Sequence, residues 1–215
     1  MMMVVVAQLV ELQIVDLAVT GSSPVDHPKS YTYAMRKEIE VKARVRDLEA
    51  VATKLVNLGC SLSEPMVQDD TIFINFDGEY TDYSPGTNFL RLRRSKGKVL
   101  FTIKQPQSNE LDCIEHETEI ADPEEFAAAL LLMGYREVMR YSKSRRKANY
   151  REYEICLDEV SNLGTFVEVE KITETEDAET VQNELFNFLE SLGARREDRI
   201  VQGYDTLFFL KNIKA

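Results

Sequence analysis

Charged and apolar residues alternate along several short stretches of this chain. In residues 38–42, Glu38, Glu40 and Lys42 stand at every second position, with Ile39 and Val41 between them. Residues i and i+2 of a β-strand point to the same side. The pattern therefore predicts a strand with one ionic face and one apolar face. Further stretches of the same kind occur at residues 91–93, 117–119, 145–147 and 168–170.

Three segments have apolar residues at helical spacing instead. The first follows Asp47, runs through Leu58 and ends before Gly59, which fits an N-cap and a residue after the C-cap. The second begins with Asp122 and Pro123 and has glutamate at position 125, a strong helix-start pattern. The third has its apolar stripe at Val181, Leu185, Phe188 and Leu192.

The remaining segments predict strands and hairpins. Residues 88–93 and 98–104 can pair across the turn at 95–97, and residues 141–150 and 153–158 can pair around 151–152. Residues 71–76 form a further predicted strand. An open sheet would leave edges unpaired, whereas closure removes them and gathers the ionic faces in one lumen. We predict an α+β protein with a closed antiparallel eight-stranded β-barrel, a tunnel with a charged lumen that amphipathic helices cover.

The composition narrows the function classes. The chain has 215 residues with 37 acids and 26 bases, a net charge of -11 that argues against a nucleic-acid-binding surface. Three scattered cysteines indicate reduced thiols and a cytoplasmic location. The chain has two histidines, and neither lies in a recognisable metal-binding or catalytic motif. This disfavours a His/Cys zinc site and a Ser-His-Asp triad. The apolar segment 1–10 is too short to span a membrane, so we expect no membrane partner.

The sequence of residues 1–34 differs in character from that of the rest of the chain. Their sequence resembles the conceptual translation of a transfer-RNA gene, which predicts a leader from a mis-assigned start and a natural start at Met35. The alternative is a genuine disordered or helical extension. We therefore expect one domain over residues 35–210 and a tail at 211–215.

Two groups of ionic residues are candidates for a site. Carboxylate oxygens suit Mg²⁺ or Mn²⁺, and the predicted metal cluster is Glu38, Glu40, Glu168 and Glu170 with Asp158 beside it. Cations that would bind phosphate oxygens are Arg91, Arg93, Lys104, Arg145 and Lys147. The alternatives are a solvated charged face and exposed salt bridges.

The orientation of other residues follows from the same pattern. Arg146 alternates to the outer face. Lys42 either binds phosphate or neutralises Glu40, and both interpretations stay open. Glu117 and Glu119 are expected in the lumen as partners of the arginines, and Tyr150 and Tyr204 are expected in the core or at the rim.

Taken in order, these motifs resemble the CYTH superfamily of triphosphate tunnel enzymes. The likeness covers about residues 35–210: the E-x-E-x-K of 38–42, R-x-R at 91–93, Lys104, E-x-E at 117–119, the basic strand that ends at Tyr150, and 157–170. The most similar branch is that of class IV adenylyl cyclases. The chain departs from it in two places, where the usual K-x-R…Y is read as Arg145-Arg146-Lys147…Tyr150 and the usual Ser-Tyr is Gly203-Tyr204.

The resemblance implies an enzyme that converts ATP to cyclic AMP and pyrophosphate with Mg²⁺ or Mn²⁺. It implies catalytic roles for Lys42, Arg93, Lys104 and Asp158. The phosphate-binding set is Lys42, Arg91, Arg93, Lys104, Arg145 and Lys147, and the metal set is Glu38, Glu40, Asp158, Glu168 and Glu170. It also leaves room for a homodimer. The alternatives are a tripolyphosphatase, thiamine triphosphatase or nucleoside triphosphatase, and a non-catalytic polyphosphate or nucleotide binder. Because the chain lacks tryptophan, the best stacking platform for a thiazole ring is missing, which disfavours thiamine triphosphate.

Overall fold

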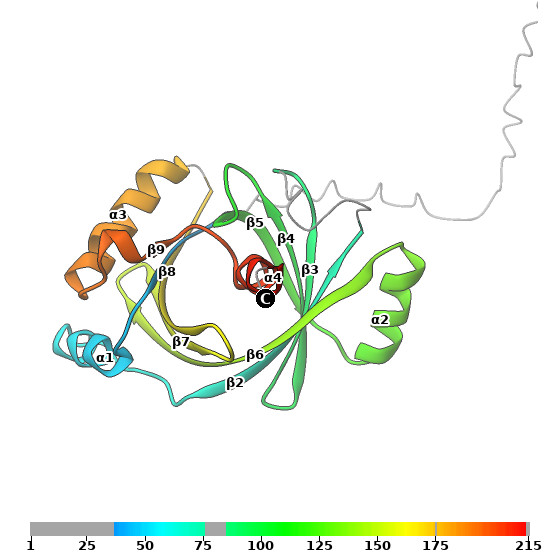
Figure 1. The fold of residues 1–215 in the computed structure, drawn as a ribbon, viewed down its shortest axis with the longest axis horizontal. Helices are drawn as coiled ribbons and strands as arrows, with labels where there is room; N and C mark the ends of the chain where they lie inside the picture. The colour runs from blue at the N-terminus through cyan, green and yellow to red at the C-terminus, as the bar shows by residue number, and fades with distance from the viewer. Residues whose placement is uncertain (1–36, 76–84, 175, 214–215) are drawn as a thin grey trace, which may run out of the picture. The chain divides into compact units, whose positions relative to one another are not determined.

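The computed structural model describes residues 37–75, 85–174 and 176–213, so the predictions for residues 1–34 lie outside the described part of the chain. Figure 1 shows a β-barrel with helices around it. The strands are β1 (Lys37–Arg44), β2 (Met66–Ile74), β3 (Phe89–Ser95), β4 (Lys98–Pro106), β5 (Asp112–Glu119), β6 (Arg136–Tyr150), β7 (Tyr153–Val160), β8 (Gly164–Thr173) and β9 (Arg199–Ile200). The helices are α1 (Leu48–Asn57), α2 (Pro123–Leu132), α3 (Ala178–Ser191), a 3₁₀ turn at Arg196–Asp198, and α4 (Tyr204–Ile213).

The barrel closes through β1. Its neighbours on the two sides are β8 and β5, and the ring runs β1-β5-β4-β3-β2-β6-β7-β8 with every pair antiparallel. The two-residue β9 adds to β1 as a short ninth strand. The prediction of a closed eight-stranded antiparallel barrel is therefore confirmed.

The apolar faces of the strands point outward, as the alternation predicts. Ile39, Val41 and Val169 are fully buried beneath α1 and α3, where they meet Leu55 and Leu185. On another side of the barrel, Leu90 and Leu92 pack against Leu130 of α2. Each such side chain contributes roughly 1.5–3 kcal/mol when it is removed from water. The outer layer thus provides the hydrophobic core, and the lumen is left to polar residues.

Helix and turn signals in the sequence are also confirmed. The side chain of Asp47 accepts a hydrogen bond from the backbone N–H of Ala50, and that of Asp122 accepts one from Glu125. In the β3–β4 turn, Lys96 and Gly97 have φ of 50° and 74°, as expected of a two-residue hairpin turn.

The helix α4 was not among the predicted helices. Its residues Tyr204 and Phe208 pack on Tyr141 and Phe166 from the strands, while Phe209 reaches Ile72. Figure 1 shows α4 over the middle of the barrel. Because Ile72 and Tyr141 also line the cavity inside the barrel, α4 covers one end of that cavity.

Candidate active site

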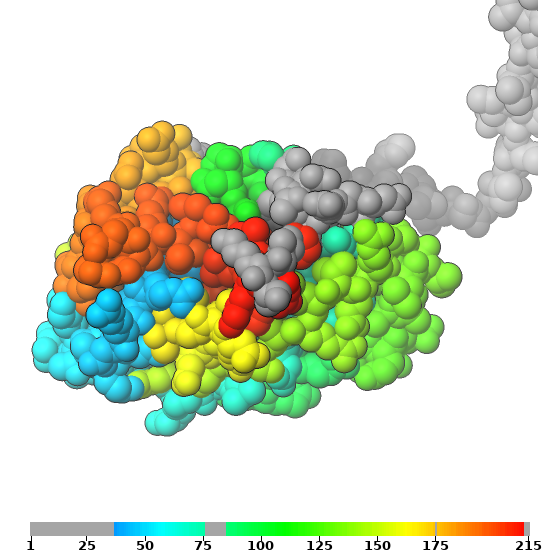
Figure 2. Space-filling model, in the orientation of Figure 1, coloured from blue at the N-terminus to red at the C-terminus, as the bar shows by residue number. Residues whose placement is uncertain are grey.

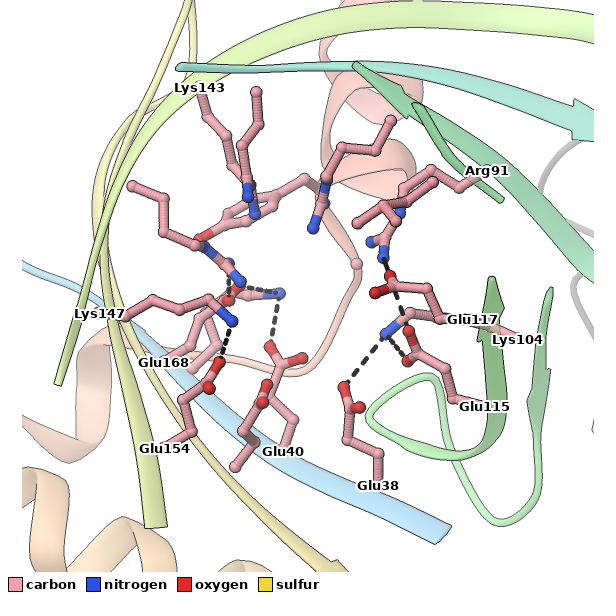
Figure 3. A pocket seen from close by; sticks show the side chains of 18 of the residues that line it. Glu38, Glu40, Arg91, Lys104, Glu115, Glu117, Lys143, Lys147, Glu154 and Glu168 are labelled. Carbon is pink, nitrogen blue, oxygen red and sulfur yellow. Dashed lines mark hydrogen bonds and ion pairs between the residues drawn. The ribbon is translucent and has the colours of Figure 1, made fainter. Parts of the chain in front are cut away.

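The barrel encloses a cavity of about 810 Å³ whose lining is mostly ionic. Figure 3 shows the side chains that point into it from strands on opposite sides of the barrel. Many of them are the ionic members of the alternating stretches. The lining includes Glu38, Glu40, Lys42, Arg91, Arg93, Lys104, Arg145, Lys147, Glu168 and Glu170. Isolated charges inside a protein are costly, so the arrangement requires mutual pairing, water or an ionic ligand.

One group of cations gathers around Asp158 at the wall formed by β6 and β7. Arg145 forms a bidentate pair with Asp158, at 2.7 Å from Nε to Oδ1 and 2.5 Å from Nη2 to Oδ2, and also contacts Glu168. Lys143 Nζ lies 3.0 Å from Asp158 Oδ2. Burial alone would raise the pKa of Asp158, but Arg145 and Lys143 hold it below its ordinary value. Lys143 and Arg145 have hardly any exposed side-chain surface, so their charges are little screened by bulk water.

Lys42 lies between two carboxylates. Its Nζ is 3.0 Å from Glu40 Oε1 and 3.1 Å from Glu168 Oε1, and it stands 4.2 Å from the centre of the Tyr204 ring. Burial would lower the pKa of Lys42, but Glu40 and Glu168 outweigh burial and raise it. Neutralisation of Glu40, one of the two interpretations left open, is therefore present in the structure.

A second group of cations faces β5. Lys104 Nζ lies 2.5 Å from Glu115 and 3.4 Å from Glu38, and Arg91 lies 3.6 Å from Glu115 and 3.7 Å from Glu117. Burial would raise the pKa of Glu115, but Lys104 and Arg91 lower it to about 2. Glu117 thus meets an arginine as predicted.

The prediction for Glu119 was wrong. It pairs with Lys98 at 2.7 Å, and both side chains are more than half exposed. The strand β5 carries its last residues away from the cavity to the surface, so alternation alone overestimates how far the ionic lumen extends.

The acidic trio Glu38, Glu40 and Glu170 fits a divalent cation. One carboxylate oxygen from each residue lies within 4.8 Å of the others. Burial raises the pKa of all three groups, and neighbouring carboxylates raise it further. Three oxygen donors that repel one another match the ligand chemistry of Mg²⁺ and Mn²⁺.

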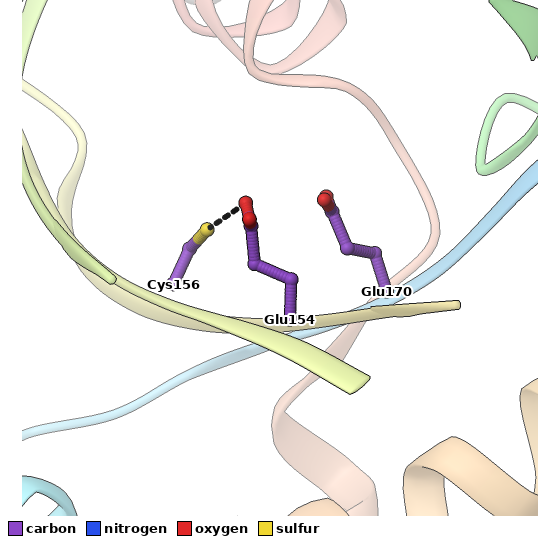
Figure 4. A group of neighbouring side chains, drawn as sticks. All are labelled: Glu154, Cys156 and Glu170. Carbon is purple, nitrogen blue, oxygen red and sulfur yellow. Dashed lines mark hydrogen bonds between the residues drawn. The ribbon is translucent and has the colours of Figure 1, made fainter. Parts of the chain in front are cut away.

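A neighbouring group shares Glu170 with this trio. Figure 4 shows Glu154, Cys156 and Glu170 together, with Cys156 Sγ 3.7 Å from Glu154 Oε1. Glu154 already forms an ion pair with Lys147. Within this second group, Glu154 therefore has a cationic partner, whereas Glu170 forms no ion pair with another described residue.

The other two predicted metal ligands lie among cations. Glu168 contacts Lys42 and Arg145, which lower its pKa well below the ordinary value although burial opposes them. Asp158 lies between Arg145 and Lys143. The structure thus brings Glu38, Glu40 and Glu170 together and places Glu168 and Asp158 in the cation group, and their role as ligands stays a prediction.

Several residues of the cavity were missed from the sequence. Lys143 was the most important omission: the lumen contains the pair Lys143 and Arg145, a K-x-R two positions before the one that was read. The signal was present, because 143, 145 and 147 share one face of β6. Asp70, Glu115 and Glu154, which pair with Arg93, Lys104 and Lys147, were also missed.

Three further placements are confirmed. Arg146 points outward and pairs with Glu49 of α1 at 3.0 Å. Tyr150 stacks on Phe188 of α3 in the outer core, with ring centres 5.1 Å apart. Tyr204 is buried and lines the cavity, and its hydroxyl donates to Asp158 at 3.0 Å.

Comparison with known proteins identifies the family. The CYTH domain model matches residues 36–204, and the chain therefore belongs to the CYTH family. A putative adenylate cyclase from Methanocaldococcus jannaschii is 28% identical over 170 residues, which cover 78% of this chain and 95% of that protein.

Solved structures share the fold. The PH1012 protein from Pyrococcus horikoshii has a TM-score of 0.65 at 26% identity, and the match covers 78% of this chain and 96% of that one. A putative adenylyl cyclase from Hippeastrum, described as having a dominant triphosphatase activity, has a TM-score of 0.53 at 18% identity over 79% of this chain and 91% of that one. Among the described residues, no helix has the length and apolar content needed to cross a membrane.

Proposed function

We propose that this protein is a metal-dependent enzyme that acts on a triphosphate inside the barrel, and that its reaction is the conversion of ATP to cyclic AMP and pyrophosphate. One observation carries the proposal: the same cavity holds a cation group around Arg145 and a carboxylate trio in which Glu170 forms no ion pair with any residue that the structure describes. A triphosphate with a bound divalent cation has the complementary charges. The names of relatives favour the cyclase.

In this reaction, basic residues of the chain would bind the phosphates and acidic residues would bind the metal. Arg91, Arg93, Lys143, Arg145 and Lys147 would hold the phosphate oxygens, the arginines through forked hydrogen bonds. Glu38, Glu40 and Glu170 would hold Mg²⁺ or Mn²⁺, which would reduce the charge on the phosphate oxygens. In this assignment Lys42 keeps Glu40 and Glu168 in place.

In the cyclase reaction the ribose 3′-oxygen forms a bond to the α-phosphorus. The bond from that phosphorus to the bridging oxygen breaks, pyrophosphate leaves with the electron pair, and the hydroxyl proton passes to water. Cations preorganised around the leaving group would stabilise the charge that develops on it. Positioning inside a closed cavity supplies much of the remaining acceleration.

A triphosphatase is the second candidate, and the description of the Hippeastrum protein favours it. There water attacks the γ-phosphorus, and the same charge arrangement serves that reaction. Product analysis separates the two. We expect cyclic AMP and pyrophosphate from ATP with Mn²⁺, whereas orthophosphate would support the triphosphatase and tight binding without turnover would support a binding protein.

The double variant Glu38→Ala, Glu40→Ala tests the acidic trio. We expect it to lose metal-dependent turnover while it stays folded by circular dichroism. The matched control is Glu49→Ala with Glu159→Ala, which removes two exposed carboxylates outside the cavity. Full turnover in the Glu38/Glu40 variant would exclude the trio as the metal site.

A further inference from the structure

One buried amide in the cavity has no hydrogen-bond donor for its oxygen. The side chain of Gln68 lines the cavity and is only 4% exposed, and no described residue donates to its Oε1. Lys143, its pairing partner on β6, forms an ion pair with Asp158. The hydroxyl of Ser95, on the other neighbouring strand, donates to the backbone carbonyl of Val67. A buried acceptor without a donor is unfavourable, so Gln68 is suited to a ligand that supplies one.

The amide lies inside the barrel, on the wall that faces the acidic trio. In Figure 2, the red residues of α4 lie in the middle of one face of the molecule, over the end of the cavity that this helix covers. Within the ring of strands, β2 stands across from β1, which supplies Glu38 and Glu40. A ligand that spans the trio and the opposite wall therefore meets Gln68.

Cations flank Gln68 on its own wall. Before it on β2, Met66 pairs with Arg145 of β6, and after it Asp70 pairs with Arg93 of β3. Lysine and arginine only donate hydrogen bonds, whereas an amide oxygen accepts them. Ionised phosphate oxygens also only accept, so they cannot satisfy Oε1. The wall that would bind the phosphates thus contains an acceptor for a different group of the substrate.

We propose that Gln68 orients the attacking nucleophile, which is the ribose 3′-hydroxyl in the reaction proposed above; the inference rests on that proposed function. Of the groups that meet at the α-phosphorus, this hydroxyl is the one that carries a hydrogen to donate. When its O–H bond is directed to Oε1, a lone pair of the 3′-oxygen can point to the phosphorus. The amide does not take the proton, which passes to water as the new bond forms. A glutamine orients the attacking water in the same way in some GTPases.

Nucleotide binding to metal-free protein tests which atom the amide meets. With a chelator present, calorimetric titration compares ATP with 3′-deoxy-ATP, which lacks the nucleophilic hydroxyl. The variant is Gln68→Met, which is similar in size and shape. We expect wild type to bind ATP about three- to tenfold more tightly than 3′-deoxy-ATP, the effect of one hydrogen bond, and the variant to bind the two equally. Tripolyphosphate, which has no ribose, should bind both proteins alike.

Turnover and stability complete the test. With Mn²⁺, Gln68→Met should lower kcat at least about tenfold, because the nucleophile is no longer aligned. Its free energy of unfolding should not fall, since an apolar group replaces an unsatisfied amide. The matched control is Gln105→Met, which removes an amide that does not line the cavity and donates to Asn88 Oδ1 at 2.9 Å. It should keep both kcat and the preference for ATP.

Three outcomes would overturn the inference. If wild type does not prefer ATP to 3′-deoxy-ATP, or if Gln68→Met keeps that preference, the amide does not meet the 3′-hydroxyl. A loss of affinity for tripolyphosphate in Gln68→Met would mean that the amide holds phosphate through Nε2. A marked loss of stability would assign it a structural role. None of these results bears on the proposed reaction, which fails instead if wild type releases orthophosphate from ATP.

Discussion

At the scale of single residues, Glu170 lies among like charges. Its carboxylate faces Glu38, Glu40 and Glu154, and burial together with these charges raises its pKa well above the ordinary value. A carboxyl group whose folded-state pKa is raised costs stability as the pH rises above its ordinary pKa, and the cost disappears as the pH falls below that value. Glu170 should therefore destabilise the metal-free protein at neutral pH.

Glu170→Gln should replace this titratable carboxyl with a neutral group of nearly the same volume. We expect the free energy of unfolding of metal-free protein to rise by on the order of 1 kcal/mol at neutral pH, and the gain to shrink as the solution is acidified. Urea unfolding with a chelator present measures it, with the exposed Glu159→Gln as control. If Mn²⁺ is then added, wild type should gain more stability than the variant. A loss of stability in metal-free Glu170→Gln would contradict this account.

The titration of Lys143 gives a second prediction. As the pH rises, the affinity for a polyanion should fall while the stability of the protein should rise. Burial and then Arg145 lower the pKa of Lys143 to about 8. As the pH rises through this value the lysine loses its charge, and affinity for tripolyphosphate should fall. Over the same range its contribution to stability should rise, since the unfolded chain, with the ordinary higher pKa, binds more protons.

Calorimetric titration of tripolyphosphate at about pH 7 and about pH 9, at constant ionic strength, checks this. The control is Lys143→Arg, which stays charged at both values. Changes in the ionisation of the ligand affect both proteins equally, so the ratio of their dissociation constants isolates Lys143. A ratio that does not depend on pH would exclude its titration.

At the scale of elements, the strands were the most predictable part. Alternation identified which residues of β1, β3 and β8 face the lumen. A strand with one ionic and one apolar face can bury its apolar side in only one orientation, because a shift by one residue would exchange the two faces. The same rule could not set the limits of β6, which begins at Arg136 and has an irregularity in its pairing with β2 between Ile72 and Phe73. Lys143 lies inside the predicted strand 141–150 and on the same face as Arg145 and Lys147, so the alternation did contain the signal that was missed there.

The helix α4 could not be recognised in the same way. Its segment Leu207–Leu210 is a short apolar run, which periodicity does not assign to helix or strand. Its packing partners, such as Tyr141 and Phe166, come from distant strands that form a surface only after the barrel has closed. The pairing of Asp70 with Arg93 and of Glu115 with Lys104 likewise depends on strand register, which single-strand patterns do not contain.

Phe208 packs α4 onto the strands at the end of the cavity that this helix covers. Its side chain should therefore contribute to the stability of the protein. Phe208→Ala removes a ring that is 9% exposed and stacked on Tyr141 at 5.1 Å. We expect a loss of about 3 kcal/mol in the free energy of unfolding, the usual cost of a truncated core phenylalanine. Urea denaturation measures it, and Val201→Ala, which shortens a half-exposed side chain just before α4, should cost far less. Equal effects of the two variants would mean that α4 is not anchored through Phe208.

At the scale of the whole molecule, the distribution of charge is the main feature. A chain with net charge -11 concentrates buried cations in one cavity, where their field is little screened by salt. A polyanion should therefore stabilise the folded protein even without metal, by binding the native state alone.

The neighbours Lys147 and Arg146 allow a matched test of this prediction, since they leave the same strand on opposite faces. Lys147 lines the cavity and Arg146 pairs with Glu49 outside it. Tripolyphosphate should raise the melting temperature of wild type and of Arg146→Ala equally. In Lys147→Ala the apparent affinity should fall about three- to tenfold, the effect of one lost charge-assisted contact at a partly exposed site. The difference in affinity between the two variants should persist in moderate salt, because charges inside the cavity are little screened. A site on the surface would lose its affinity under the same conditions. If both variants weakened binding alike, the polyanion would be held by the general field of the protein and not by the wall of the tunnel.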